Sequence, residues 1–279
     1  MDTLEHPHDL TSGEIQPHPP FEAQASENLS GLYENLGNIQ NDFRNRNLYV
    51  LLTRQLKAVS LLDIGSGAGH FLNHARQKGL QTTGIEPNAA LIALSEKLYG
   101  SSSRTLNIGI DQIDRLGALR YDNITMLDVL EHIQDDVSLL KKLRHFLKKD
   151  GRLIILAPCY RHLYGIRDKK LGHYRRYERS ELIAKLHAAG YEILRCRFWN
   201  MLGYFAYAIS EKLLKKEIPT SLRTAGRKNS WQRFCVRALA AWLEIVENHI
   251  HLGFGLSLLC VAIPRNLPER YGKPGKSKG

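Results

Sequence analysis

The sequence predicts an α/β fold: a doubly wound, mostly parallel seven-stranded sheet with a helical insertion before the last strand. The first observation is that short apolar runs alternate with helical patterns through residue 158. The second is a glycine-rich turn directly after the first run, and the third is that polar side chains stand where several runs end. Such alternation is typical of a parallel sheet with right-handed crossovers. Because ligands bind beyond the carboxyl ends of the strands in these sheets, the polar side chains mark a candidate site.

Composition agrees with a packed intracellular protein. The chain has 279 residues, 43% of them hydrophobic, and a formal net charge of +11. Its four cysteines are scattered, which is typical of a reducing compartment and argues against a cysteine zinc site. No stretch reaches the roughly 20 apolar residues of a membrane span, and the beginning lacks a signal-peptide pattern. We therefore expect a cytoplasmic protein whose positive charge suits anionic partners.

Changes in composition along the chain divide it into five segments. The first is polar and without periodicity, which predicts disorder, whereas the central part alternates between strand and helix patterns. The segments are a disordered tail at 1–37, a core at 38–199, a helical cap at 200–254, the last strand of the core at 255–264 and a basic tail at 265–279.

The first strand is expected at Ser60–Ile64, and it leads into a turn in which Gly65, Gly67 and Gly69 alternate with small residues. Glycine permits positive φ and lets a ligand approach the main chain. The start of the following helix presents free N–H groups to a polar or anionic group. A dinucleotide fingerprint would have its third glycine at position 70, where this chain has His70. The turn therefore predicts a nucleotide-type pocket of another kind.

The second strand, Thr82–Ile85, ends in Glu86 and Pro87. Glu86 follows Gly65 by 21 residues. A carboxylate about 20 residues after the first glycine, at the end of the second strand, is the expected acceptor for ribose hydroxyls. The alternative interpretation is an exposed Glu at a strand end. The paired spacing favours the ribose contact.

The remaining elements continue the alternation, and the last two strands are expected to form an antiparallel pair. Helices are expected from Asn38, from Phe71, at Ala89–Tyr99, at Val137–Lys149 and at Glu178–Gly190, and strands at Arg104–Ile110, from Asn123, at Gly151–Pro158, at Tyr191–Trp199 and at Gly255–Ile263.

Two phrases of the sequence resemble motifs of class I S-adenosylmethionine-dependent methyltransferases. Residues 61–69 contain Leu-Asp-Ile-Gly-Ser-Gly-Ala-Gly, and residues 128–133 read Asp-Val-Leu-Glu-His-Ile. The resemblance covers about residues 40–264 and implies a Rossmann-like methyltransferase fold with S-adenosyl-L-methionine as cofactor. The implied cofactor contacts are Arg46, Asp63, Gly65, Ser66, Gly67, Gly69, Glu86, Pro87, Asp111, Asp128 and Val129.

Two of these contacts leave an alternative open. Asp111 stands one residue after the place where the family usually carries the acid for the adenine amino group, so a backbone amide could serve instead. Arg46 lies in Asp42–Asn47, which resembles the aromatic-x-x-Arg helix of a bacterial subgroup, where Arg can face the cofactor carboxylate. The alternative for Arg46 is a surface side chain.

A long loop at 160–177, rich in Tyr, His, Lys and Arg, follows the fifth strand. Long loops in compact domains are commonly functional. Within it, Asp168 to Tyr177 matches the Asp-x-x-x-Gly-His-x-Arg-Arg-Tyr signature of the same bacterial subgroup. The loop is therefore the expected place of the methyl acceptor.

Two interpretations of the loop are open. In one, His173 acts as a general base near neutral pH, with His132 as the second candidate, while arginines hold an anionic acceptor. In the other, Arg175 and Tyr177 only anchor the loop to the next helix. No metal is implied. The candidate acceptor-binding residues are Tyr160, Tyr164, Arg175 and Arg176.

The connection before the last strand contains two amphipathic patterns, one beginning at Met201 and the other at Trp231. The first interpretation is a helical cap packed on the core. The second is a cap that covers the acceptor pocket and rests on an anionic membrane surface, where it reaches a lipid-linked substrate.

These observations together predict an S-adenosylmethionine-dependent methyltransferase for a small-molecule or lipid-linked acceptor, with an anionic acceptor and O-methylation favoured. The alternatives are an RNA methyltransferase, a nicotinamide-dependent oxidoreductase and a non-catalytic relative that uses the fold for binding. The substitution of His70 for the third glycine speaks against the oxidoreductase. Against RNA stands the absence of a recognisable RNA-binding module.

Overall fold

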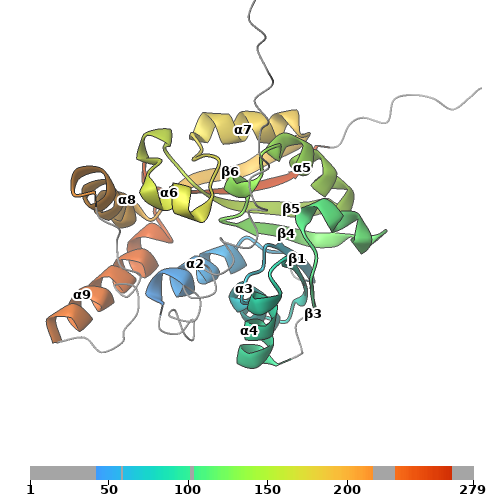
Figure 1. Cartoon of the computed structure of the whole chain (residues 1–279), viewed down its shortest axis with the longest axis horizontal. Coiled ribbons are helices and arrows are strands. Elements are labelled where there is room, and N and C mark those ends of the chain that lie inside the picture. The colour runs from blue at the N-terminus through green and yellow to red at the C-terminus, as the bar shows by residue number, and fades with distance from the viewer. Residues whose placement is uncertain (1–41, 58, 101–103, 216–229, 266–279) are drawn as a thin grey trace, which may run out of the picture.

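One sheet organises the protein (Figure 1). The structure is a computed structural model, and it describes residues 42–57, 59–100, 104–215 and 230–265. The expected N-terminal tail lies outside these residues, as does nearly all of the expected basic tail. In the described part the strand order is β3-β2-β1-β4-β5-β7-β6. The strands are β1 (Ser60–Ile64), β2 (Gln81–Ile85), β3 (Arg104–Leu106), β4 (Tyr121–Leu127), β5 (Leu147–Pro158), β6 (Tyr191–Trp199) and β7 (Ser257–Pro264).

The directions of the strands confirm the predicted fold class. Neighbouring strands from β3 to β5 are parallel, whereas β7 is antiparallel to both β5 and β6. The carboxyl ends of β1 to β6 therefore share one edge of the sheet, which we call the rim. Both faces are covered, as a mostly parallel sheet requires (Figure 1). One face carries α2 (Phe43–Thr53), α3 (His70–Gln77) and α4 (Ala89–Tyr99), and the other carries α5 (Asp136–Leu143) and α7 (Arg179–Ala188).

The hydrophobic core consists of two clusters, one on each face of the sheet. Alternate residues of β5 divide between them: Leu153 and Ile155 belong to one cluster, and Ile154 and Leu156 to the other. All four side chains are fully buried. A strand that is apolar on both sides is what a central position in a doubly covered sheet demands.

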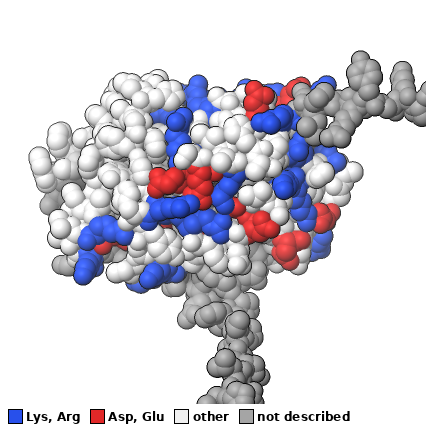
Figure 2. All heavy atoms as spheres, turned by 90° about the horizontal axis from the view of Figure 1, so that it is seen from above, with Lys and Arg blue, Asp and Glu red and all other residues white. Residues whose placement is uncertain are grey.

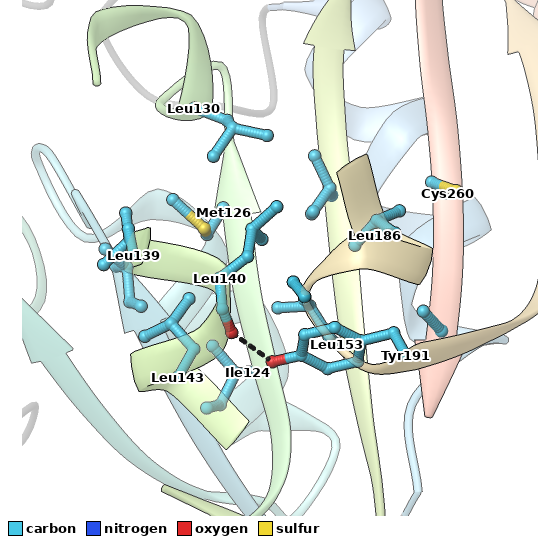
Figure 3. Close-up of a cluster of buried hydrophobic side chains, with 14 of the residues drawn as sticks. Ile124, Met126, Leu130, Leu139, Leu140, Leu143, Leu153, Leu186, Tyr191 and Cys260 are labelled. Atoms are coloured by element: carbon cyan, nitrogen blue, oxygen red, sulfur yellow. Dashed lines mark hydrogen bonds between the residues drawn. The ribbon is translucent and has the colours of Figure 1, made fainter. Parts of the chain in front are cut away.

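Figure 3 shows part of the cluster beneath α5 and α7. Side chains of α5 lie against those of β4 and β5, and Leu186 closes the cluster from α7. Tyr191 is also buried there, and its hydroxyl donates a hydrogen bond to the backbone oxygen of Leu140 at 3.0 Å. The bond satisfies the one polar atom of this side chain, so the ring can be buried without an orphaned hydroxyl.

Several predicted boundaries were wrong; the fifth strand, for example, begins at Leu147 and not at Gly151. The helix expected at Val137–Lys149 ends at Leu143, because Leu147 already pairs with Tyr121 and begins β5. The strand expected at Arg104–Ile110 ends at Leu106, because the N–H of Ile108 donates back to the Leu106 carbonyl and turns the chain. By contrast, the sixth strand has the expected bounds.

The insertion between β6 and β7 contains α8 (Met201–Tyr207) and α9 (Ser230–Ala241), each continued by a π-helical turn. Buried Glu247 joins the two ends of the insertion. Its carboxylate accepts hydrogen bonds from the N–H of Asn200, directly after β6, at 2.6 Å and from the indole of Trp242, directly after α9, at 2.8 Å. Asn248 donates to the backbone oxygen of Asn47 in α2 at 3.1 Å. None of the helices in the described residues is long and apolar enough to cross a membrane.

Candidate active site

The glycine turn lies at the centre of the rim, between β1 and α3. Gly65, Gly67 and Gly69 have φ values of 66°, 54° and 71°, a region that residues with a Cβ rarely adopt. The N–H groups of Gly65 and Ser66 both donate to the carbonyl of Ile85, which ties the turn to the end of β2. The turn therefore has a fixed shape, and its residues from Ser66 to Gly69 are buried.

Close packing gives Gly65 a second reason to be glycine. A Cβ at this position would lie 2.6 Å from Cγ2 of Val129, the second residue after β4. The turn is thus pressed against the chain that leaves β4. The tips of β1, β2 and β4 meet at this point, as the predicted cofactor contacts require.

Glu86 lies under the turn, at the end of β2. Its carboxylate accepts hydrogen bonds from the N–H of Gly67 at 2.8 Å and from that of Asn88 at 3.0 Å. Burial raises the pKa of Glu86, and these two backbone donors oppose that rise. A carboxylate has about four acceptor sites, so it keeps capacity for hydroxyl groups. An oriented carboxylate beside a bare glycine main chain fits the ribose and adjoining atoms of S-adenosylmethionine.

Asn107 is a residue of this site that sequence reasoning missed. Its side-chain amide donates to the backbone oxygen of Glu86 at 3.0 Å and to that of Pro87 at 2.8 Å. It therefore fixes the β2 tip from the end of β3. Asp111 lies a little further on, exposed in the first turn of the short helix Ile110–Leu116, and its adenine contact stays a prediction. An Asn directly after a strand was the available signal.

Asp63 and Ser66 have less access to a ligand than the pattern suggested. Asp63 is buried within β1 and accepts a hydrogen bond from the Thr125 hydroxyl of β4 at 2.6 Å. Burial raises the pKa of Asp63 to about 7; the Thr125 bond opposes this rise and the charge of Glu86 adds to it. The Ser66 hydroxyl is buried and has no hydrogen-bond partner among the described residues. We therefore assign Asp63 to supporting the rim, and any direct contact with a cofactor stays a prediction.

Arg44, and not the predicted Arg46, is the α2 cation that lies against the rim. Arg44 lies 3.7 Å from the Asp128 carboxylate and stacks over the Trp199 ring at 5.2 Å, whereas the Arg46 side chain is exposed. Asp42 caps the helix by accepting from the N–H of Arg44, and this cap sets the helical phase. The geometry moves the carboxylate-binding proposal from Arg46 to Arg44.

Asp128 itself has an unusual backbone. It is a non-glycine residue with φ of 54°, directly after β4, and its side chain is 44% exposed. Such conformations cluster at functional sites because the surrounding fold must hold them in place. Asp128 and Val129 thus stand on the rim beside the glycine turn, where the sequence predicted them.

A buried carboxylate organises the acceptor loop. Asp168, in α6 (Ile166–Leu171), bonds to Nδ1 of His173 at 2.9 Å, to Nε of Arg176 at 2.9 Å and to the Tyr207 hydroxyl at 3.0 Å. Although burial would raise it, the hydrogen bonds from His173 and Arg176 hold the pKa of Asp168 well below its ordinary value. Because the ionised carboxylate only accepts, Nδ1 of His173 donates this hydrogen bond, and Nε2 is the ring nitrogen that Asp168 does not engage.

The loop arginines contact acids of the fold. Arg176 is buried and paired with Asp168, so it has little access to an acceptor. Arg175 pairs with Asp136 at 3.0 Å, and the Tyr177 hydroxyl donates to the same carboxylate at 2.8 Å. These contacts correct the predicted acceptor-binding role of Arg175 and Arg176: they support the anchoring interpretation.

The two candidate tyrosines differ in their surroundings. Tyr160, half-buried after β5, has φ of 66°, and its ring stacks on Phe198 and meets Tyr204 edge-on. Burial raises the pKa of Tyr160 to about 12, so its hydroxyl stays protonated. Tyr164 donates to the backbone oxygen of His173 at 2.7 Å and thereby holds the loop. Tyr160 is the better remaining candidate for acceptor contact.

The two predicted catalytic histidines lie together. The rings of His132 and His173 meet edge-on with centroids 4.7 Å apart, and Nε2 of His173 is 3.9 Å from Oε1 of Glu131. Burial, followed by the charge of His173, lowers the pKa of His132 to about 4, so His132 is neutral at pH 7. Sequence reasoning did not single out Glu131, which is fully buried.

Comparison with known proteins identifies the family. Residues 32–195 match the methyltransferase domain family, and the chain belongs to it. In a curated relative, the ubiquinone biosynthesis O-methyltransferase of Rhodopseudomonas palustris (strain TIE-1), 104 residues are 30% identical, covering 36% of this chain and 40% of the relative. The enzyme of the same name from Coxiella burnetii (strain Dugway 5J108-111) is 28% identical over 100 residues, 35% of this chain and 43% of the relative. The match thus spans about two fifths of these relatives' length.

Solved structures support the fold. The CcbJ methyltransferase of Streptomyces caelestis has a TM-score of 0.57 at 10% identity and covers 88% of this chain and 99% of its own. Phosphoethanolamine N-methyltransferase 2 of Haemonchus contortus, solved with S-adenosyl-L-methionine, has a TM-score of 0.55 at 16% identity. The match covers 88% of this chain and 59% of that one. At the level of this domain, the family match confirms the predicted methyltransferase class.

Proposed function

We propose that the protein transfers the methyl group of S-adenosylmethionine to a hydroxyl oxygen of a small-molecule acceptor that lies at the rim between the ends of β4 and β5. The observation that carries this proposal is the Glu86 carboxylate, held under the glycine turn by the N–H groups of Gly67 and Asn88. O-methylation is favoured by the names of the curated relatives, which are ubiquinone biosynthesis O-methyltransferases.

The residues of the rim divide the work of binding the cofactor. S-adenosylmethionine supplies a methyl group already activated on a sulfonium. Glu86 would accept its ribose hydroxyls, and Asn107 keeps the β2 tip in place. Arg44 would hold the carboxylate of the cofactor, because its guanidinium already lies on the rim beside Asp128. The chief contribution of the protein is then to align donor and acceptor.

The histidine pair is the proposed place where the acceptor hydroxyl is prepared for attack. Nδ1 of His173 is engaged by Asp168, so Nε2 is the atom through which this side chain acts on the acceptor. His132 is neutral at pH 7 and adjoins it. Asp168 is a positioning residue in this arrangement, because it fixes the tautomer and orientation of His173.

We further propose that the acceptor is lipid-linked and is met at an anionic membrane surface. Several large apolar side chains of the insertion are exposed: Phe205, Ile209, Leu213, Trp231, Phe234 and Ile245. Helix α9 carries Arg233 and Arg237 and no acid. On the face seen in Figure 2, by contrast, acidic side chains stand between the Lys and Arg side chains. Exposed apolar residues beside these cations suit an anionic lipid surface.

Transfer of a labelled methyl group into a cell extract tests the acceptor class. The wild-type chain and labelled S-adenosylmethionine are incubated with the extract, which is then separated into lipid, small-molecule and RNA fractions. The proposal expects label in the lipid or small-molecule fraction as an alkali-stable ether. Label in RNA alone, or on nitrogen, would contradict it. Sedimentation with vesicles containing phosphatidylglycerol tests the surface: Trp231→Ala with Phe234→Ala should reduce binding, and unchanged binding would remove the membrane contact.

A further inference from the structure

A buried carboxylate beside the histidine pair has no hydrogen-bond donor among the described residues. Glu131 is fully buried, and neither of its carboxylate oxygens accepts a hydrogen bond from another described residue. Burying an unpaired carboxylate costs several kcal/mol, so such a group takes up a proton or meets a cation.

Glu131 points at two other ligand atoms. One ligand atom from each of Glu131, His132 and His173 lies within 4.8 Å of the other two. A tetrahedral cation with ligands at 2.0–2.2 Å needs them about 3.4 Å apart, so the three side chains have to close by roughly an ångström. His132 and His173 are half-buried, which leaves a path from solvent.

The surroundings of His173 match those of a metal ligand. A ligating His almost always donates its other ring N–H to a carboxylate, which fixes the ring and its tautomer. Asp168 plays this part: it is buried and bonds to Nδ1, while Nε2 faces Glu131.

We propose that Glu131, His132 and His173 bind a divalent transition-metal cation, with Asp168 orienting His173. Two imidazoles and one carboxylate suit zinc and its neighbours rather than magnesium or calcium. No metal was expected from the sequence, because Glu131 and His173 stand 42 residues apart and belong to different motifs.

The inference rests on the proposed function in one respect, the role of the cation. A cation at this place would lower the pKa of an acceptor hydroxyl bound to it. In that case Nε2 of His173 would hold the cation, and the proton of the acceptor hydroxyl would pass to solvent water. Binding of the metal is independent of that role, so it is measured without turnover.

The test uses the full chain after removal of metals with a chelator. Zn²⁺ is titrated by calorimetry, and the visible spectrum of added Co²⁺ reports coordination number. S-adenosylhomocysteine is titrated into the same samples. Wild type should bind one Zn²⁺ per chain, and Glu131→Gln and His173→Gln should each weaken this binding at least about 100-fold. Both variants should keep S-adenosylhomocysteine binding.

Histidines elsewhere provide matched controls. His145 is exposed on another part of the molecule, and His6, His8 and His18 stand near the beginning of the chain, outside the described residues. His145→Ala and the triple replacement of the other three by Ala should leave Zn²⁺ affinity unchanged. Loss of binding in either control would overturn the assignment.

Each remaining outcome is also decisive. The metal site is refuted if wild type binds no Zn²⁺, or if both ligand variants still bind Zn²⁺ tightly. Glu131 is then buried in its protonated form and not as a metal ligand. If a ligand variant also fails to bind S-adenosylhomocysteine, that variant has lost its fold. The decision then comes from the triple histidine control, which should bind one Zn²⁺ per chain as wild type does. If wild type binds Zn²⁺ but not S-adenosylhomocysteine, the metal site is supported and the proposed function is contradicted. If wild type binds S-adenosylhomocysteine but not Zn²⁺, the metal site is contradicted and the proposed function is not.

Discussion

The two sides of the rim are built in different ways. On the cofactor side, the contacts at the glycine turn are largely made by the backbone and join residues close in the sequence. The N–H of Gly67, for example, donates to the carboxylate of Glu86, 19 residues further on. On the acceptor side the contacts are made by side chains. Some are near in the sequence, as from Asp168 to His173, and others are distant: Tyr177 donates to Asp136 across 41 residues and Tyr207 to Asp168 across 39. One side is a local backbone shape, and the other is a network of buried charges.

Because the two sides differ in this way, different substitutions are expected to disrupt them. A local turn fails when a Cβ intrudes, because the main chain itself is the binding surface. A buried charge network fails when one member is removed, because its partners are left unpaired.

The largest effect is expected from Asp168→Asn on the acceptor side. It removes the charge that balances buried Arg176, and breaking a buried pair typically costs about 3–5 kcal/mol of unfolding free energy. Urea unfolding at pH 7 measures it. Asp114→Asn, which removes the exposed pair with Lys142, should cost less than about 1 kcal/mol. Equal losses in the two variants would show that the network has no special weight.

The second effect concerns pH and the cofactor side. The pKa of Asp63 is about 7 in the fold and 3.8 ordinarily, so the folded state holds the proton more tightly. Wild type should therefore lose stability as pH rises from 4 to 7, on the order of 2–4 kcal/mol relative to Asp63→Asn. Unfolding free energies at several pH values measure this.

Asp122 provides a control of opposite sign. Although its partial burial acts to raise it, hydrogen bonds from Lys148 and Ser60 lower the pKa of Asp122. Its contribution is present at neutral pH and lost as pH falls, so Asp122→Asn should lose its cost in acid. A flat difference between wild type and Asp63→Asn from pH 4 to 7 would contradict the burial of a protonated Asp63.

A third effect tests the turn directly. Gly65→Ala places a Cβ 2.6 Å from Val129 at φ of 66°, and the turn has to move. We expect affinity for S-adenosylhomocysteine to fall about 100-fold, or about 2.7 kcal/mol, by calorimetry. Gly79→Ala has the same backbone strain, with φ of 88°, but open space at its Cβ, and should leave affinity unchanged. Similar affinities for the two variants would remove the close-packing argument.

The smallest effect tests the link between insertion and loop. Tyr207→Phe removes one hydrogen bond to Asp168 and keeps the ring under Arg176, so a loss of about 1–2 kcal/mol is expected from urea unfolding. Tyr204→Phe, which keeps its ring packing on Tyr160, serves as the control. A loss in the control as large as that in Tyr207→Phe would mean that the Asp168 bond adds nothing.

What could be predicted from the sequence follows the same division. The fold class, the glycine turn and the place of Glu86 at the end of β2 depend on local spacing, and they were predicted. Arg44 was missed in favour of Arg46, because the phase of α2 depends on the cap at Asp42. Glu131 and Asp168 could not be assigned, because burial and long-range partners, and not spacing, determine what a carboxylate does.

The central claim is that the rim holds an adenosyl group at the glycine turn and Glu86. The most direct test is calorimetric titration of the full wild-type chain with S-adenosylhomocysteine and, separately, with NAD. The account predicts one S-adenosylhomocysteine bound per chain and no binding of NAD. Binding of NAD alone, or of neither ligand, would contradict it.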